Sequence, residues 1–302
     1  MITGLNRFLS EQEKEEYVRR SDAVFSASLA EVSEQILCCN ARVVMLSGPS
    51  ASGKTTTAAR LSEILRRTGK RMEFVSLDDF YLDRAVNERR AALAGTAVDY
   101  ESAQAIDLEA FACFADELCH GGKANCPVYD FRTGNRSGWR ELEVSEDCIV
   151  LMEGIQALYP EVERYLSSLP FCRIFSRPTG ELSVGGSVFD GNELRLCRRI
   201  VRNITHRGSS AQKEFDLWKQ VRDNEEKNIF PFVGGENMLM LNPLFAYEVN
   251  ILKPYLSEAL EALPEDSEYA AYAADLLRRF APIEPISRDY LPEDSVFREF
   301  VF

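Results

Sequence analysis

The stretch Gly48-Pro49-Ser50-Ala51-Ser52-Gly53-Lys54-Thr55 decides the fold, because it matches the pattern G-x-x-x-x-G-K-[ST] between an apolar run and an amphipathic segment. In a loop of this kind, successive backbone N–H groups face a phosphate at the positive end of the following helix. A chance match is the alternative, with a frequency on the order of one in a hundred for a chain of about 300 residues. We therefore expect a nucleotide-phosphate site, with Lys54 on the β- and γ-phosphates, the Thr55 hydroxyl on Mg²⁺, and further contacts from Gly48, Ser50, Ala51, Ser52, Gly53 and Thr56.

Apolar runs alternate with amphipathic segments on both sides of this loop. Their periodicity predicts strands at 42–47, 71–77, 147–152, 171–175 and 238–241, and helices at 11–37, 54–68, 107–119, 161–166, 192–206, 211–224, 245–263 and 268–280. A hairpin is expected from 126–131 and 141–144, and a glycine-rich loop at 179–191. The alternation predicts an α/β fold: a P-loop NTPase-type parallel sheet with helices on both faces, a small β-hairpin, an Arg-rich helical lid and a helical C-terminus.

Carboxylates follow two of the predicted strands. Glu153 ends the apolar run 148–152, and Asp78 and Asp79 end the strand before it. Ligands of a doubly wound sheet bind beyond the carboxyl ends of its strands, so these acids are placed to hold a metal or to accept a proton from an attacking hydroxyl. The alternative is that they are ordinary strand-end, turn or helix-capping residues.

The predicted helix at 192–206 carries a stripe of four arginines, which share one helix face because they follow the spacing i, i+3, i+4, i+7. They are Arg195, Arg198, Arg199 and Arg202, and Arg207 follows. Guanidinium groups bind phosphate in a planar, bidentate manner, so the stripe resembles a mobile lid at about 192–210 that closes over transferring phosphates. The alternative is that these arginines pair with neighbouring acids.

An acceptor site should lie between Lys54 and Glu153. This part of the chain contains Tyr81, the run 99–101 with Glu101, and the run 127–131 with Tyr129 and Phe131. Aromatic rings could enclose a flat base and carboxylates could accept ribose hydroxyls, although aromatic residues pack in cores just as often.

Composition limits the classes of partner. Lys and Arg total 35 against 48 Asp and Glu, a formal net charge of −13, which disfavours nucleic acid or an anionic membrane as the main partner. The eight cysteines form no C-x-x-C pair, and only His120 and His206 could join them in a zinc site. Because the chain also shows no apolar stretch typical of a signal peptide or membrane span, we expect a cytoplasmic protein with reduced thiols.

Six segments in order, GPSASGKTT, SLDDFY, VDYESAQAIDLEAF, PVYDF, VLMEGI and RLCRRIVRNITHRG, resemble the uridine kinase family of P-loop nucleoside kinases, in the uridine kinase/phosphoribulokinase superfamily. The resemblance covers about 42–263 and is greatest to a bacterial uridine-kinase-like branch. It implies a kinase domain at 41–264, with an N-terminal helical extension at 1–40 and a C-terminal helix and tail at 265–302 packed on it.

The resemblance also implies residue roles. Asp78 would be the catalytic base and join Thr55 and Glu153 around Mg²⁺, while Lys54, Arg202 and Arg207 would act on the transferring phosphate. Glu101 stands where the family holds the ribose through an aspartate, Tyr129 matches the aromatic residue beside the base, and Arg199 matches the substrate-side arginine. Tyr81 and Phe131 complete the expected substrate contacts as aromatic candidates of the same region. The chain departs from the pattern at Gly134, where better-known members carry a base-contacting histidine, at Ser209, which replaces an arginine, and near Leu217, where a base-reading glutamine has no clear match.

We therefore expect Mg²⁺-dependent phosphorylation, by ATP or GTP, of a primary hydroxyl on a small molecule, chiefly the 5′-OH of uridine, cytidine or a related nucleoside. Two alternatives stay open: a P-loop kinase for a sugar phosphate or a pantothenate-like alcohol, and a nucleotide-binding regulator that has lost kinase chemistry. RNA binding is a weaker alternative because of the acidic balance. A homo-oligomer is compatible with the sequence.

Overall fold

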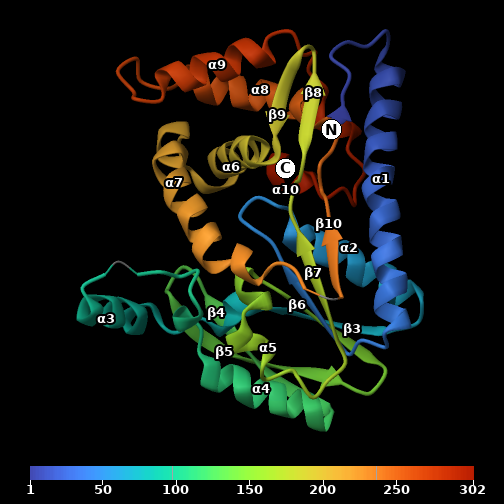
Figure 1. The fold of residues 1–302 in the computed structure, drawn as a ribbon, viewed down its shortest axis with the longest axis vertical. Coiled ribbons are helices and arrows are strands. Elements are labelled where there is room, and N and C mark those ends of the chain that lie inside the picture. Colours follow the sequence, from blue (N-terminus) through green and yellow to red (C-terminus); the bar gives the residue numbers. More distant parts are fainter. Residues whose placement is uncertain (97, 236) are drawn as a thin grey trace.

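The computed structural model describes residues 1–96, 98–235 and 237–302, and its central feature is a sheet of five parallel strands in the order β10-β7-β2-β6-β3 (Figure 1). Every residue of β2 and β6 is buried, as expected for parallel strands that helices cover on both faces. The predicted α/β fold with a parallel sheet is confirmed. The strands are β2 (Val43–Ser47), β3 (Arg71–Ser76), β6 (Cys148–Glu153), β7 (Phe171–Ser176) and β10 (Met238–Leu241).

Helices surround this sheet, and α1 runs along one side of the molecule against α2 (Figure 1). The helices are α1 (Glu11–Cys38), α2 (Lys54–Arg67), α3 (Arg84–Ala94), α4 (Leu108–His120), α5 (Pro160–Glu163), α6 (Gly191–Arg207), α7 (Ala211–Asn228), α8 (Glu248–Glu261), α9 (Ala270–Phe280) and α10 (Arg298–Val301). Short 3₁₀ turns are η1 (Leu77–Phe80), η2 (Ala103–Ala105), η3 (Ile155–Leu158), η4 (Phe230–Phe232) and η5 (Arg288–Tyr290). Helix α3 has no counterpart among the predicted elements.

The prediction of a loop at 179–191 was wrong, because this segment forms a hairpin of β8 (Glu181–Val184) and β9 (Ser187–Asp190). The two-residue turn between them is Gly185-Gly186, and both glycines have positive φ, which such hairpin turns require. The hairpin is anchored because Leu182 and Phe189 are buried. Strand β1 (Ile2–Thr3) adds to its edge, parallel to β8.

A second hairpin, β4 (Gly122–Asp130) and β5 (Asn135–Val144), packs against α4 and extends further than predicted. The register shifts at Val128/Tyr129, so a β-bulge lies near the C-terminal end of β4. Bulges re-aim side chains next to functional sites.

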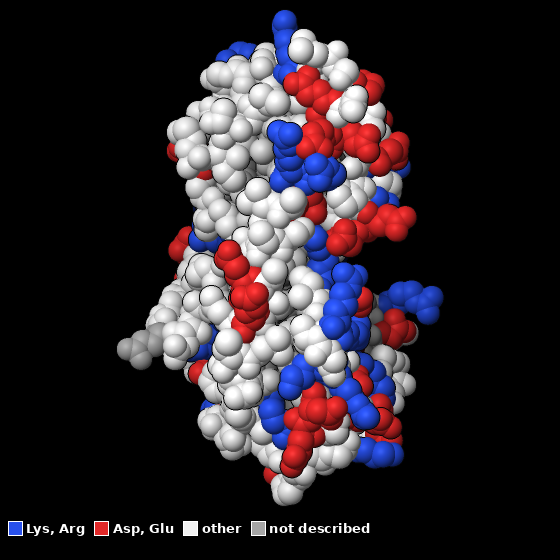
Figure 2. Space-filling model, turned by 90° about the vertical axis from the view of Figure 1, so that its right-hand side faces the viewer, with Lys and Arg blue, Asp and Glu red and all other residues white. Residues whose placement is uncertain are grey.

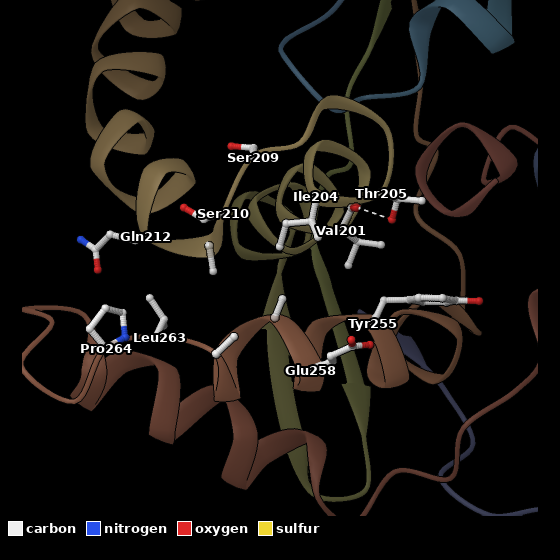
Figure 3. A pocket seen from close by; sticks show the side chains of 13 residues that line it. Val201, Ile204, Thr205, Ser209, Ser210, Gln212, Tyr255, Glu258, Leu263 and Pro264 are labelled. Carbon is white, nitrogen blue, oxygen red and sulfur yellow. Dashed lines mark hydrogen bonds between the residues drawn. The ribbon is translucent and has the colours of Figure 1, made fainter.

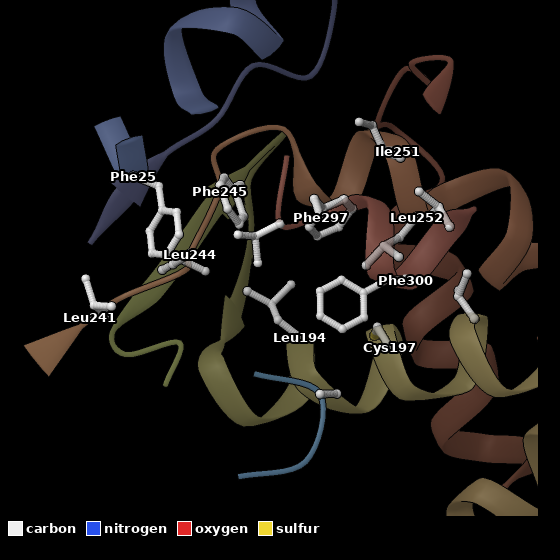
Figure 4. Packing of buried hydrophobic residues seen from close by; sticks show 14 of the residues in the cluster. Phe25, Leu194, Cys197, Leu241, Leu244, Phe245, Ile251, Leu252, Phe297 and Phe300 are labelled. Carbon is white, nitrogen blue, oxygen red and sulfur yellow. The ribbon is translucent and has the colours of Figure 1, made fainter. Parts of the chain in front are cut away.

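Buried side chains from both ends of the chain meet in one core. Figure 4 shows Phe25 of α1, Phe245 and the C-terminal Phe297 and Phe300 packed with Leu194 of α6. The C-terminal tail is therefore a structural part of this core. The domain division at 1–40, 41–264 and 265–302 stays a prediction.

The surface and the thiols add few constraints. Acidic and basic side chains are interspersed on the face that Figure 2 shows. No helix in the described ranges is long and apolar enough to cross a bilayer. Within those ranges, no three or more His, Cys, Asp or Glu side chains cluster as a metal site, and all eight cysteines are free.

Candidate active site

The P-loop, 48–53, connects the buried strand β2 to the first residue of α2, Lys54. The loop curls because Ala51 and Gly53 adopt positive φ angles of 57° and 80°. A Cβ added to Gly53 would lie 2.5 Å from Cγ1 of Val296, so glycine is required both for the backbone conformation and for the packed tail. The sequence motif thus occupies the strand–loop–helix context that phosphate binding needs.

Two predicted metal-binding side chains meet directly beside this loop. The Thr55 hydroxyl donates to Oε1 of Glu153 at 3.4 Å, and the Ser76 hydroxyl donates to the same oxygen at 3.4 Å. This convergence follows from the sheet, because Glu153 pairs in register with Leu46 of β2 and Ser76 of β3. Hard oxygen donors of this kind suit Mg²⁺, which takes one or two carboxylates and completes its shell with phosphates and water.

Asp78 lies in η1, directly after β3. It is close enough to Glu153 and Lys54 for their charges to interact. Burial raises the pKa of Asp78 and of Glu153, and the nearby charge of Lys54 lowers both. A carboxylate whose pKa is raised is a stronger proton acceptor once it is ionised, which suits the base expected at Asp78.

An aromatic pocket of about 370 Å³ opens beside Asp78. The rings of Tyr129 and Phe131 lie 5.1 Å apart, those of Tyr81 and Tyr129 lie 5.9 Å apart, and Phe131 is 58% exposed. The pocket is lined by Asp78, Tyr81, Arg84, Tyr100, Tyr129 and Phe131. Its volume falls in the range that binds small molecules, and it brings the predicted base to the predicted aromatic residues.

Glu101 is largely buried, and its Oε2 atom has no hydrogen-bond partner in the described part of the chain. Burial, followed by the charges of Glu225 and Asp99, raises its pKa to about 7, while Lys54 and Arg199 act in the opposite direction. An unpartnered buried oxygen is costly unless a ligand uses it. Glu101 is therefore available to accept a ligand hydroxyl.

Two of the α6 arginines support the back of the P-loop. Both side chains are fully buried: Arg195 forms an ion pair with Glu225, and Arg198 pairs with Glu248 at 2.6 Å. Arg195 Nε also donates to the backbone oxygen of Ser50 at 2.9 Å. These two residues hold the loop's shape, a role that the sequence did not indicate.

The other α6 arginines lie closer to the surface. Arg199 donates to Ser50 Oγ at 2.9 Å and to Glu214 at 2.7 Å, and Arg202 pairs with Glu299 at 3.3 Å. Each arginine of the stripe thus has a carboxylate partner, which was the alternative interpretation of this pattern. Arg207 ends α6 and is exposed. The lid at about 192–210 stays a prediction.

Another pocket, of about 470 Å³, lies between the C-terminal part of α6, the start of α7, and α8 (Figure 3). Its walls are mainly apolar. In Figure 3, Val201 and Ile204 lie across the pocket from Tyr255 and Glu258, and Leu263 and Pro264 lie at its other end, near Gln212. None of the predicted site residues lines it.

Together, the buried parallel sheet, the glycine loop after β2 and the acids at the ends of β3 and β6 define a P-loop α/β protein. The family model "Phosphoribulokinase / Uridine kinase family" matches residues 43–238. The chain belongs to this family.

Relatives of known name agree with this assignment. The chain is 28% identical over 222 residues to a uridine kinase of Saccharomyces cerevisiae, covering 72% of this chain but 40% of that protein. It is 28% identical over 233 residues to a uridine kinase of Halobacterium salinarum, covering 76% and 90%. A solved structure of a candidate fructose transport system kinase from Silicibacter sp. TM1040 shares the fold, with a TM-score of 0.52 and 19% identity over 70% of this chain and 98% of that one.

Proposed function

We propose that this protein transfers the γ-phosphoryl group of ATP or GTP to a primary hydroxyl of a small molecule, the 5′-OH of uridine, cytidine or a related nucleoside. The observation that carries the proposal is the position of Asp78, which lines the aromatic pocket and also lies in the field of Lys54 beside the P-loop. A donor site and an acceptor site that share one carboxylate are what direct phosphoryl transfer requires.

On the donor side, the P-loop amides and Lys54 bind the β- and γ-phosphates. Thr55, Glu153 and Asp78 would hold Mg²⁺, which would neutralise charge on the transferring group. Arg202 and Arg207 contribute further positive charge at this side. Arg199, which the sequence predicts at the acceptor, donates to Ser50 Oγ of the P-loop and therefore adds its charge here as well. The 3.4 Å contact between the Thr55 hydroxyl and Glu153 supports this donor set.

On the acceptor side, the base lies among Tyr81, Tyr129 and Phe131, and the ribose hydroxyls donate to Glu101. The 5′-oxygen attacks the γ-phosphorus, its proton passes to Asp78, and the bond to the oxygen that bridges the β- and γ-phosphorus atoms breaks. Two observations support this arrangement: Glu101 Oε2 has no hydrogen-bond partner among the described residues, and the Phe131 ring, although it contacts Tyr129, is 58% exposed. We also propose a cytoplasmic location, since all eight cysteines are free thiols.

The test is ATP consumption with a panel of acceptors: uridine, cytidine, purine nucleosides, sugar phosphates and pantothenate-like alcohols. The proposal predicts turnover with a pyrimidine nucleoside and a 5′-monophosphate product. Turnover only with a sugar phosphate or a pantothenate-like alcohol would replace the acceptor. Tight ATP binding without turnover on any acceptor would favour a nucleotide-binding regulator instead.

A further inference from the structure

The acceptor pocket contains a positive charge that the proposed function does not use. Arg84, the first residue of α3, lines the pocket together with Tyr129 and Phe131. Its Nη2 atom donates to the backbone oxygen of Phe131 at 3.1 Å, and no carboxylate in the described part of the chain forms an ion pair with it. This is unlike the α6 stripe, in which every guanidinium has a carboxylate partner.

The turn of the β4–β5 hairpin positions this guanidinium. The Arg84 N–H donates to the backbone oxygen of Gly134 at 2.7 Å, and a Cβ added to Gly134 would lie 2.6 Å from Arg84 Cζ. Glycine at position 134 therefore leaves the space that the guanidinium occupies. Asp78 and Arg84 line the same pocket. An acceptor whose reacting hydroxyl lies at Asp78 therefore has a different group of the same molecule next to Arg84.

We propose that Arg84 is a specificity-determining residue that contacts the base of the acceptor and selects bases carrying a carbonyl oxygen there. This inference rests on the proposed function. A guanidinium only donates hydrogen bonds, so it pairs with a uracil carbonyl but opposes the amino group at the corresponding position of cytosine. Polar sites reject analogues that leave their hydrogen-bonding groups unpaired.

The experiment measures kcat/KM for uridine and cytidine in the wild type and in Arg84→Met. We expect the wild type to prefer uridine by about tenfold and Arg84→Met to reduce this ratio to about one, mainly through the KM for uridine. Arg89→Met, on the same helix but outside the pocket, is the matched control and should keep the wild-type ratio.

A wild-type preference for cytidine, or an unchanged ratio in Arg84→Met, would overturn the role of Arg84 while leaving nucleoside phosphorylation intact. Failure of the wild type to phosphorylate either nucleoside would instead overturn the proposed function, and this inference with it.

A different observation concerns the C-terminal segment. Glu299 of α10 accepts hydrogen bonds from the Thr56 hydroxyl at 3.1 Å and from Arg202 Nη1 at 3.3 Å. Thr56 lies in the first turn of the helix that follows the P-loop. A hydroxyl at a helix N-terminus and a guanidinium are the donors that attract a phosphate oxygen, and here a carboxylate occupies them.

Buried packing holds Glu299 in this position. Phe297 and Phe300 on either side of it are fully buried (Figure 4), and the Arg198 guanidinium lies 4.9 Å from the Phe300 ring centroid. After burial and Asp78, Glu299 also contributes to raising the pKa of Glu153, so its charge is felt at the proposed metal site.

We infer that the Glu299 carboxylate competes with the nucleotide for Thr56 and Arg202, and that it must leave both before a triphosphate is fully bound. This inference also rests on the proposed function, since it assumes that these two residues contact phosphate. The C-terminal segment then acts as a built-in competitor that lowers nucleotide affinity.

The test is the Kd for Mg·ATP, measured by calorimetry on the full chain, in the wild type, in Glu299→Gln and in Glu293→Gln. Removing the competing charge should tighten binding by about tenfold in Glu299→Gln, whereas the exposed Glu293 should have no effect. A melting temperature close to the wild-type value would show that Glu299→Gln is folded.

Unchanged or weaker binding in Glu299→Gln would overturn the competitor role; weaker binding would assign the carboxylate to positioning Arg202. If all three proteins fail to bind Mg·ATP, the proposed function itself is wrong. A binding defect confined to Glu299→Gln leaves that function standing.

Discussion

Around the P-loop, buried ion pairs from α6, α7 and α8 hold the backbone, whereas the acceptor pocket is enclosed by aromatic rings that are partly open to solvent. Arg195 and Arg198 are fully buried, while Phe131 in the pocket is 58% exposed. The donor side is thus preorganised by charge and close packing, and the acceptor side by shape with a single cation. We therefore expect the P-loop that binds phosphate to be rigid, and the aromatic side chains of the acceptor pocket to adjust to the ligand.

The largest expected effect is at Asp78, where the two sides meet. Asp78→Asn removes the proton acceptor and should lower kcat by about 10³-fold, while the Kd for ATP changes little. Asp79→Asn is the control, because Asp79 accepts the Tyr129 N–H at 3.2 Å and an asparagine oxygen can do the same. Equal turnover in Asp78→Asn and the wild type would remove Asp78 from catalysis.

The rigidity of the donor side can be tested through the ion pair of Arg198 and Glu248. Glu248→Gln leaves a buried guanidinium without its counter-charge, so the free energy of unfolding should fall by about 3–5 kcal/mol. Glu63→Gln, which breaks the exposed pair with Arg67, should cost less than about 1 kcal/mol. Urea denaturation measures both values, and equal losses would show that the P-loop support is not preorganised.

The acceptor side should respond differently to truncation. Phe131→Ala removes an exposed ring that we expect to stack on the base, so the KM for uridine should rise by about tenfold. The KM for ATP and the free energy of unfolding should stay near their wild-type values. Steady-state kinetics with each substrate varied in turn measures this, and a parallel rise in both KM values would contradict the separation of the two sides.

The smallest effect is a pH dependence at Glu101, whose pKa is raised to about 7. The carboxyl group is protonated and neutral below this pH and ionised above it. The ionised carboxylate accepts hydrogen bonds from hydroxyl groups more strongly. The KM for uridine should therefore fall a few-fold between about pH 6 and 8, and Glu101→Gln should flatten this dependence. A pH profile that is identical in the variant would exclude Glu101 from the acceptor site.

The Glu101 carboxyl group should also make folding stability depend on pH. Raising the pH should weaken the fold, whereas it should strengthen uridine binding. Its folded-state pKa of about 7 lies above the ordinary value of 4.5, so between these pH values the folded state keeps a proton that the unfolded state has lost. Stability should therefore decrease as pH rises through this window, and the contribution should disappear in Glu101→Gln.

Local signals made the donor side predictable. The P-loop, the buried strands and the acid at the end of β6 are each recognised from residues close together in the chain. Asp78 was identified from the family segment SLDDFY, which lies in the expected order among the other family segments. The structure confirms the parallel sheet. It places the Thr55 hydroxyl 3.4 Å from Glu153, and the charge of Lys54 acts on both Asp78 and Glu153.

Long-range contacts explain what the sequence did not show. The partners of Arg195 and Arg198 are 30 and 50 residues away, and Glu299 lies 97 residues from Arg202. Helical spacing reveals that four arginines share a face but not which acids will meet that face. Arg84 likewise enters the pocket only because Phe131, 47 residues later, returns to it through the hairpin.

The decisive experiment is a crystal structure of the protein with Mg²⁺, a non-hydrolysable ATP analogue and uridine. We expect the γ-phosphate at the P-loop near Lys54, the metal between Thr55 and Glu153, and the uridine 5′-oxygen within hydrogen-bond distance of Asp78. A triphosphate bound elsewhere, or a 5′-oxygen pointing away from Asp78, would contradict it.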